Sequence, residues 1–354
     1  MMTREGDVDP LFQSTSLGPL VLKNRIVRSA TNEHLSEPDG QVTRVWADTL
    51  IELAKNEVGL VISGHFCVDA SQRANEGQPV LDDATDIELL HYAVDGVHRY
   101  GGKILFQLSH SGIKALESVN GVPPKHPEDF TMQELDQLVG RFVTAALRCQ
   151  GCGADGVQIH TAHGYLLSNF LNPAENRRTD EYGGRLENRF RLVARILSAV
   201  RTACGEKFAL IVKTDCNGCE DFSALLRLYE KYGVDGIEVS GIDFNQRVGQ
   251  KTPFYAQNLL QSCKCTSIPV FQTGGVFSRQ VAEELLQQKF PLVSFSRALI
   301  CEPDFISKLK SGTQNESKCL ACNGCFSVYR RRFVRCTQHR SPIPQLQKVF
   351  DRGS

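Results

Sequence analysis

The chain has 354 residues and a mass of 39.3 kDa, and its 40 Lys and Arg residues balance 40 Asp and Glu residues. This neutral total, without a basic run, argues against a nucleic-acid binder and against an anionic-membrane binder, since both usually carry a basic excess. Hydrophobic residues at 41% and charged residues at 23% are ordinary for a globular protein, which excludes a disordered chain and permits one large α/β domain.

The N-terminus and the 13 cysteines bear on where the protein is found. The first residues are acidic where a signal peptide needs an apolar stretch, and no window is long and apolar enough to span a bilayer. An odd number of cysteines would leave one unpaired in an oxidising compartment, so they are predicted to be intracellular thiols. We therefore expect a cytoplasmic protein without a membrane segment.

Short β-branched runs alternate with longer amphipathic segments, which is typical of repeated βα units. Helices are predicted between the runs, for example over residues 132–149 after the N-cap candidate Thr131, and over residues 186–203. Several runs are apolar on both faces, as in parallel strands that are covered by helices. The pattern predicts one (β/α)₈ TIM barrel, with eight strands at residues 25–30, 59–63, 103–108, 156–160, 208–213, 236–240, 269–272 and 292–295.

The chain is longer than the barrel requires. Eight units of about 44 residues exceed a typical barrel of about 250 residues, so we expect enlarged loops at residues 112–130, 166–184 and 241–268. From Cys319 onward the sequence becomes rich in cysteine and arginine. We therefore assign the barrel to residues 1–312 and a short Cys-rich C-terminal extension to residues 313–354.

The segment IHTAHGYLLSNFLNP is the first candidate for chemistry, because working residues of such a barrel lie at the carboxyl ends of its strands. His160 closes a predicted strand, so its imidazole and that of His163 converge only if the chain turns between them. Two ring N–H groups aimed at one oxygen would stabilise charge on a carbonyl or phenolate, with Tyr165 as a proton source. Histidines bonded to the backbone, or two ligands of a metal, remain alternatives.

A second candidate follows the last two predicted strands. Glycines after the seventh strand and a Ser-Arg pair after the eighth occur where barrels commonly bind a phosphate, because backbone N–H groups and a helix N-terminus face the anion there. A turn is the alternative interpretation of the Gly-Gly pair. The candidate phosphate residues are Gly274, Gly275, Ser296 and Arg297.

Five segments in order carry a resemblance to a known family: LKNRIVRSATNE, VGLVISGH, ILFQLSHSG, VQIHTAHGYLLSNFLNPAENRRTDEYGGRLENRFRL, and GGVFSRQVAEELL with VSFSRALICEPDF. Over about residues 11–305 the chain resembles the Old Yellow Enzyme family of FMN-dependent NADH:flavin oxidoreductases. It is close to the barrel of the 2,4-dienoyl-CoA reductase-like members. The resemblance implies a barrel that binds FMN noncovalently across its carboxyl-terminal mouth, with NADH or NADPH as the reductant.

The resemblance also implies roles for individual residues. Those expected to contact FMN are Ser29, Ala30, Thr31 and Asn32 at the edge of the ring system, Gly64 and His65 on the second strand, Gln107 and His160, Lys213 near flavin N1 and O2, and Gly274, Gly275, Ser296 and Arg297 at the phosphate. Three of these positions depart from familiar members. Asn32 replaces a Thr or Cys, and Lys213 replaces an arginine that many members have. His34 replaces a tyrosine that faces substrate in some of them.

The resemblance implies a catalytic mechanism as well. His160 and His163 match the pair that holds the substrate oxygen, and Tyr165 matches the proton donor. The expected substrate is a small conjugated carbonyl compound bound by His34, His160, His163 and Tyr165. Hydride from reduced flavin N5 goes to the β-carbon of the activated C=C, and Tyr165 protonates the α-carbon.

The extension carries four cysteines in the spacing C-x2-C-x2-C-x10-C, namely Cys319, Cys322, Cys325 and Cys336. This resembles the [4Fe–4S] segment of 2,4-dienoyl-CoA reductases and trimethylamine dehydrogenases, although two intervals are shorter than expected. A structural zinc site and a set of reduced thiols are the other two interpretations. The sequence does not choose among these three.

The sequence therefore predicts an FMN-dependent NAD(P)H oxidoreductase of the ene-reductase type. One alternative is a flavin/iron–sulfur dehydrogenase or a dienoyl-CoA-type reductase, and a non-catalytic alternative is a flavin electron-transfer or redox-sensing module. A symmetric homo-oligomer is expected. Nucleic acid and membrane are not expected partners.

Overall fold

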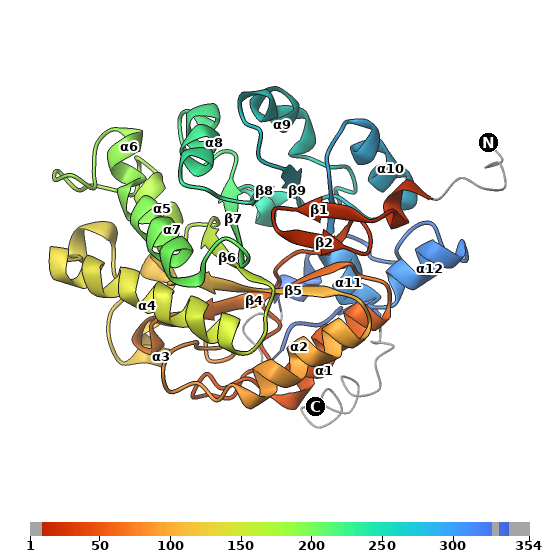
Figure 1. The fold of residues 1–354 in the computed structure, drawn as a ribbon, viewed down its shortest axis with the longest axis horizontal. Coiled ribbons are helices and arrows are strands. Elements are labelled where there is room, and N and C mark those ends of the chain that lie inside the picture. Colours follow the sequence, from red (N-terminus) through yellow and green to blue (C-terminus); the bar gives the residue numbers. More distant parts are fainter. Residues whose placement is uncertain (1–8, 328–332, 340–354) are drawn as a thin grey trace.

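The computed structural model describes residues 9–327 and 333–339. Within them, eight parallel strands form one sheet in the order β10-β3-β4-β5-β6-β7-β8-β9. A parallel bridge between Thr273 and Ser294 connects β9 to β10 and closes the sheet, so the predicted (β/α)₈ barrel is confirmed (Figure 1). All eight predicted strands are present: β3 Ile26–Arg28, β4 Leu60–Cys67, β5 Lys103–Ser109, β6 Gly156–Thr161, β7 Ala209–Asp215, β8 Gly236–Ser240, β9 Val270–Gln272 and β10 Val293–Phe295.

Helices follow every strand and surround the barrel (Figure 1). The predicted helix after Thr131 is α4. Its N-terminus is stabilised by a reciprocal capping box between Thr131 and Glu134. The predicted helix over residues 186–203 is interrupted at Phe190, whose ring packs 5.2 Å from that of Tyr229. The helices are α1 Arg44–Lys55, α2 Glu88–Arg99, α3 Glu117–Asn120, α4 Met132–Gly151, α5 Leu166–Leu171, α6 Leu186–Arg189, α7 Arg191–Cys204, α8 Phe222–Lys231, α9 Ala256–Ser262, α10 Arg279–Gln287, α11 Arg297–Cys301, α12 Phe305–Ser311 and α13 Gly324–Ser327.

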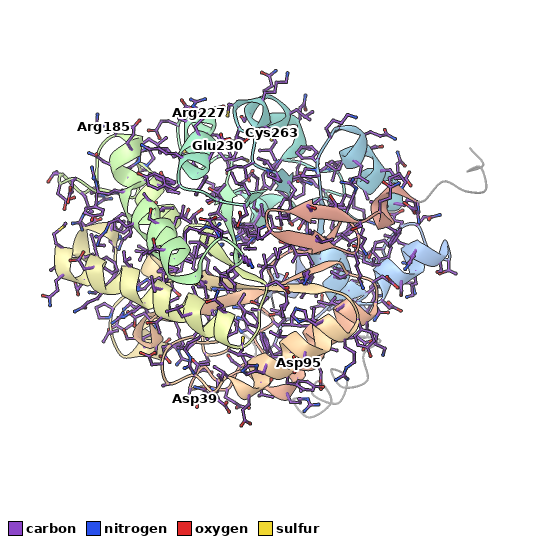
Figure 2. The ribbon with its side chains drawn as sticks, viewed as in Figure 1. Asp39, Asp95, Arg185, Arg227, Glu230 and Cys263 are labelled. Atoms are coloured by element: carbon purple, nitrogen blue, oxygen red, sulfur yellow. The ribbon has the colours of Figure 1, made fainter. Side chains whose placement is uncertain are left out.

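The outer helices bury one face and leave the other in solvent. Figure 2 shows Asp95 on α2 and Arg227 on α8 pointing away from the barrel, and both side chains are exposed. On the inner face of α8, Leu225 and Leu226 are buried in the layer between helices and strands. This one-sided apolar pattern is what attaches each helix to the sheet.

A hairpin that the sequence analysis did not predict precedes the barrel. It consists of β1 Thr15–Leu17 and β2 Leu20–Leu22, joined through Gly18 at φ +53° (red in Figure 1). Leu17 and Leu22 are fully buried, and they pack with residues of the barrel interior such as Leu60, Ile211 and Phe271. Truncating one such leucine costs roughly 2–5 kcal/mol of stability. The hairpin thus closes the amino-terminal end of the barrel and leaves the carboxyl-terminal end for a site.

The part of the C-terminal extension that the structure describes contacts the loops at the carboxyl-terminal end of the barrel. Asn323 Nδ2 donates to the carbonyl of Asn245 at 3.1 Å, and the Val334 amide donates to the carbonyl of Glu33 at 2.9 Å. Residues 328–332 and 340–354 of the predicted extension lie outside the described residues. In the described part of the chain, no helix combines the length and the apolar character needed to cross a membrane.

Candidate active site

A cavity of about 1110 Å³ lies at the carboxyl-terminal end of the barrel. Every strand sends a residue into its lining, either from its last residues or from the residues that follow it. These residues are Ser29 after β3, His65 on β4, Gln107 on β5, His160 on β6, Lys213 on β7, Ser240 on β8, Thr273 after β9 and Ser296 after β10. This is the end of the barrel at which (β/α)₈ enzymes place their active sites.

The structure brings His160 and His163 together. The backbone of His163 has φ +63°, so the chain turns after β6 and the two ring centroids lie 5.3 Å apart. The left-handed conformation is uncommon for a residue other than glycine. It is held by the His163 amide, which donates to Asp215 Oδ2 at 2.6 Å, and by His163 Nε2, which lies 2.8 Å from Ser240 Oγ.

Both imidazoles are kept neutral by their surroundings. Burial is the main cause that lowers the pKa of His160 and of His163 well below its ordinary value, and the cation of Lys213 acts in the same direction. A neutral imidazole donates one hydrogen bond and accepts another. The pair can therefore hold an oxygen without bringing positive charge of its own.

Tyr165 and His65 complete a group with the two histidines, which we call the His–Tyr cluster: His65, His160, His163 and Tyr165. The Tyr165 ring lies 5.0 Å from His160 and 4.8 Å from His65, measured between centroids. Tyr165 Oη is 3.4 Å from His65 Nε2. The sequence analysis placed His65 beside FMN, and the structure also places it beside the tyrosine.

An aromatic wall that the sequence analysis missed lies against the cluster. The ring of Phe244 packs 4.4 Å from His163, and Phe326 of the extension lies 5.5 Å from Phe244. Phe244 lies in the loop over residues 241–268, which was expected to be enlarged but has no periodic pattern from which its position could be read. Both rings line the cavity.

Polar groups inside the barrel lie beneath the cavity. Lys213 Nζ donates to Ser29 Oγ at 2.7 Å and lies 3.4 Å from Glu238 Oε2. Gln107 Nε2 donates to Gln158 Oε1 at 2.6 Å. Burial lowers the pKa of Lys213, and the carboxylate of Glu238 opposes that shift. Lys213 thus lines the cavity as a buried basic residue paired with Glu238, and its expected position near flavin N1 and O2 stays a prediction.

Three of the four predicted phosphate residues line the same cavity. Gly274, Ser296 and Arg297 line the cavity, whereas Gly275 does not. Gly275 has φ +79°, and a Cβ on it would lie 1.6 Å from the carbonyl oxygen of Thr252, so only glycine fits there. The Arg297 guanidinium donates to the carbonyl of Ala321 at 3.4 Å and to Asn323 Oδ1.

The predicted residues after β3 also line the cavity, while Gly64 does not. The lining includes Ser29, Ala30, Thr31, Asn32 and His34. A Cβ on Gly64 would lie 2.6 Å from the carbonyl oxygen of Thr31. Gly64 therefore allows the segment that carries these residues to pass close to β4, and it acts on the site through that segment.

The lining fits FMN. Asn32 Nδ2, His160 Nδ1 and Thr273 Oγ1 are buried in the cavity lining without a hydrogen-bond partner among the described residues, which indicates groups reserved for a ligand. Cations at Lys213 and Arg297 suit a molecule that carries a phosphate at one end and a ring able to hold negative charge.

The four cysteines of the extension differ in exposure, since Cys319 is buried, Cys325 and Cys336 are half-buried and Cys322 is exposed. Cys325 lines the cavity, and the Cys319 thiol hydrogen-bonds with that of Cys301 on α11. Among residues 9–327 and 333–339, no group of three or more His, Cys, Asp or Glu side chains is placed to hold a metal ion. A cluster and a zinc ion therefore both stay predictions from the cysteine spacing.

Comparison with known sequences gives a family. The sequence model of the NADH:flavin oxidoreductase / NADH oxidase family matches residues 10–316. An NADH oxidase of Thermoanaerobacter brockii is 30% identical over 374 aligned positions, which cover 96% of this chain and 57% of that protein. An NADPH dehydrogenase of Halalkalibacterium halodurans is 31% identical over 309 positions, covering 83% and 91%. The chain thus spans little more than half the length of the first relative.

Comparison with solved structures gives the same fold. A 2-naphthoyl-CoA reductase in complex with 2-naphthoyl-CoA superposes with a TM-score of 0.87 at 20% identity, covering 97% of this chain and 58% of that one. An old yellow enzyme homologue of Zymomonas mobilis superposes with a TM-score of 0.77 at 22% identity, covering 93% and 98%. At such identities the similarity concerns the fold.

Proposed function

Because the chain belongs to the NADH:flavin oxidoreductase / NADH oxidase family, we propose that it is an FMN-dependent NAD(P)H oxidoreductase that reduces activated C=C bonds. The observation that carries the proposal is the convergence of His160, His163 and Tyr165 in one cavity with two cationic groups. A flavin-bearing electron carrier would have no need of a tyrosine placed beside a histidine pair.

FMN, when bound, supplies the redox chemistry by taking hydride from NAD(P)H and passing it to the alkene. Residues of this chain would form the binding site for FMN. Arg297, Ser296 and Gly274 would hold the phosphate, and Lys213 would lie at the ring. A lysine offers a point charge in place of the bidentate fork of an arginine, so it stabilises negative charge without fixing the orientation of the group that bears it.

His160 and His163 hold the carbonyl oxygen of the substrate. Negative charge moves onto this oxygen during alkene reduction, and N–H groups already aimed at it stabilise the transition state more than the ground state. Loss of one such donor typically costs about 2.7–4 kcal/mol in the activation barrier. Burial of the His160 ring strengthens the effect, because water does not compete with it.

Tyr165 supplies the proton. Its O–H bond breaks as a C–H bond forms at the α-carbon, and the phenolate regains a proton from water before the next turnover. The hydroxyl is buried beside His160, so the same substrate can contact the oxygen-holding pair and the proton donor at once.

A conjugated CoA ester is the second candidate substrate. It is favoured by the likeness over 97% of this chain to a reductase solved with 2-naphthoyl-CoA, and by the volume of the cavity. This candidate uses the same three residues and needs no metal cluster in the extension.

The test is a comparison of half-reactions on purified protein. We expect flavin absorption bands, bleaching by NADH or NADPH under anaerobic conditions, and recovery of the bands on addition of 2-cyclohexen-1-one. His160→Ala should slow the recovery about 100-fold or more while bleaching continues. Equal recovery in both proteins would show that His160 does not hold the substrate oxygen, and absence of flavin would overturn the proposal as a whole. Crotonyl-CoA in place of the enone tests the second candidate.

A further inference from the structure

We infer that His65 is a positioning residue, which donates a hydrogen bond from Nε2–H to Tyr165 Oη and thereby directs the tyrosine's own proton to the substrate. This inference rests on the proposed role of Tyr165 as proton donor. The direction of the His65–Tyr165 hydrogen bond does not depend on that role, because it follows from residues on the far side of the His65 ring.

The direction is fixed by a backbone amide. Ala74 N–H can only donate, and it lies 2.6 Å from Gln78 Oε1, so the oxygen of the Gln78 side chain is identified by its partner. The amide nitrogen of Gln78 must then be the atom 2.7 Å from His65 Nδ1. An amide nitrogen donates, so His65 Nδ1 accepts and carries no proton.

The ring proton of His65 is consequently on Nε2. Burial lowers the pKa of His65 to about 3, and Lys213 and His34 act in the same direction, so the ring is neutral. A neutral ring with an accepting Nδ1 has its one proton on the other nitrogen. That nitrogen faces Tyr165 Oη at 3.4 Å, a separation typical of an active site whose hydrogen bonds shorten when substrate binds.

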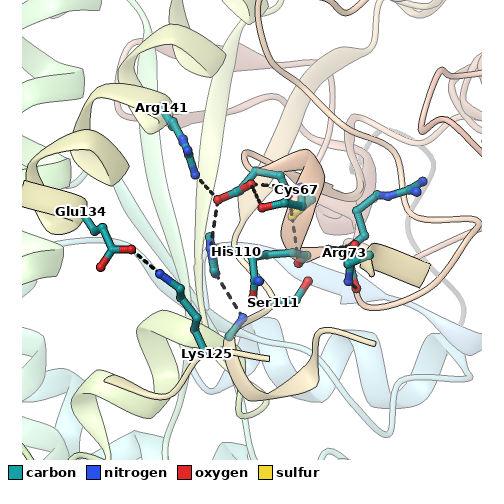
Figure 3. Close-up of polar contacts among 12 residues, drawn as sticks. Cys67, Arg73, His110, Ser111, Lys125, Glu134 and Arg141 are labelled. Carbon is teal, nitrogen blue, oxygen red and sulfur yellow. Dashed lines mark hydrogen bonds and ion pairs between the residues drawn. The ribbon is translucent and has the colours of Figure 1, made fainter. Parts of the chain in front are cut away.

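The segment that carries Gln78 is held in place by a buried network (Figure 3). Ser111 Oγ donates to Gln78 Oε1 at 3.2 Å, and the Cys67 thiol donates to the carbonyl of Gln72 at 3.3 Å. His110, labelled in Figure 3, accepts at Nδ1 from the backbone amide of Gly112 at 3.1 Å, and its Nε2 lies 3.7 Å from Asp69 Oδ2. Gln78 is fully buried, so this network keeps its amide from turning over.

Two consequences follow for Tyr165. An oxygen that accepts from His65 has its own O–H bond pointing elsewhere, which favours transfer of that proton to carbon. Once the proton has left, His65 N–H faces a phenolate and stabilises it, as a charge-assisted hydrogen bond does. The amide of Gln78 does not release a proton, so His65 orients the donor and does not relay protons to it.

Rapid kinetics of four variants, compared with the unmodified enzyme, test the inference. His65→Leu removes the donor, whereas His65→Gln places an amide N–H close to the position of Nε2–H. We expect oxidation of the reduced enzyme by 2-cyclohexen-1-one to slow about 10- to 100-fold in His65→Leu, which is part of the roughly 10²–10⁴-fold contribution of a general acid, and to recover most of its rate in His65→Gln. In a Tyr165→Phe background, His65→Leu should not lower the rate of this oxidation any further.

The outcomes separate the two proposals. A Tyr165→Phe enzyme with full activity would overturn the role of the tyrosine, which is the proposed function. A loss from His65→Leu that is equally large with and without the Tyr165 hydroxyl would overturn the positioning role and leave the proposed function intact. Flavin content and thermal unfolding of each protein identify any variant that has lost its fold, in which case His65→Gln decides.

A second readout does not depend on activity. The ¹⁵N spectra of histidine-labelled protein report which ring nitrogen bears hydrogen. We expect His65 to be protonated at Nε2 only. Gln78→Leu should weaken that preference, because it removes the obligate donor to Nδ1 and leaves the Ser109 hydroxyl, 3.1 Å from Nδ1, which can donate or accept. A His65 ring protonated at Nδ1 in the unmodified enzyme would overturn the inference whatever the kinetics show.

Discussion

Lys213 Nζ and Glu238 Oε2 lie 3.4 Å apart in the barrel interior, with side chains that are 3% and 0% exposed. Glu238 also accepts hydrogen bonds from Gln158 at 3.0 Å and Ser294 at 2.6 Å. Two charges removed from water to this degree are tolerable only as a pair. The pair therefore links the stability of the barrel to the cation that the site presents to its ligand.

Lys213→Met is expected to destabilise the protein by about 3–5 kcal/mol, since it leaves the Glu238 carboxylate buried and unpaired. The double variant Lys213→Met/Glu238→Gln should recover most of that loss, because neither charge remains. Urea unfolding of the flavin-free proteins measures both values. A double variant no more stable than the single one would show that the pair is not the cause.

Asp215 predicts a dependence of stability on pH. Burial raises the pKa of Asp215 to about 7, above its ordinary value of 3.8, so the folded state binds this proton more tightly than the unfolded state. The resulting stabilisation is complete below about pH 4 and is lost as the pH rises through about 7. The amount is on the order of 4 kcal/mol.

Asp215→Asn should flatten this part of the pH profile, because the amide is neutral at every pH and its oxygen still accepts from the His163 amide. Unfolding free energies at pH 4.5 and 7.5 are to be compared in both proteins. Asp95→Asn on the exposed face of α2 is the control and should keep the slope of the unmodified protein. An unchanged slope in Asp215→Asn would contradict the assignment.

The barrel itself could be predicted from sequence because its strands are apolar on both faces and helices follow them at regular intervals. The β1–β2 hairpin could not be, since three-residue strands are too short to display a period. Gly18-Pro19 before the Leu20-Val21-Leu22 pattern was its one local signal. The interruption at Phe190 likewise depends on tertiary packing against Tyr229 and has no signal of its own.

The residues of the candidate site likewise fall into those that a sequence motif identifies and those that only the folded chain reveals. Six residues at the end of β6 contain His160, His163 and Tyr165, so a motif could identify them. Gln78 and Phe244 lie in irregular loops from different parts of the chain, where only the folded chain brings them to the cluster. Cys301 shows the same limit, because its thiol meets that of Cys319 although the cysteine spacing gave no indication of it.

The aromatic wall is expected to fix the position of His163. Phe244→Ala removes the ring 4.4 Å from that imidazole and should lower kcat/KM for 2-cyclohexen-1-one about tenfold, because a misplaced group loses much of its catalytic effect. Phe326 packs against Phe244 at 5.5 Å, so Phe326→Ala should have a smaller effect, about threefold. Leu320→Ala, exposed on the same extension, is the control. A larger effect from Phe326→Ala than from Phe244→Ala would show that the extension contacts substrate directly.

Arg297 predicts how the phosphate of FMN is recognised. Its guanidinium faces the cavity while also donating to the carbonyl of Ala321 and to Asn323 Oδ1 of the extension. Lysine cannot make these contacts and a phosphate contact together, so Arg297→Lys should weaken FMN binding about 10- to 100-fold, which corresponds to about 1.4–2.7 kcal/mol. Quenching of flavin fluorescence on titration with flavin-free protein gives the dissociation constant. Riboflavin lacks the phosphate, so its affinity should hardly change in the variant. An equal loss for both flavins would mean that Arg297 acts by anchoring the extension and does not bind the phosphate.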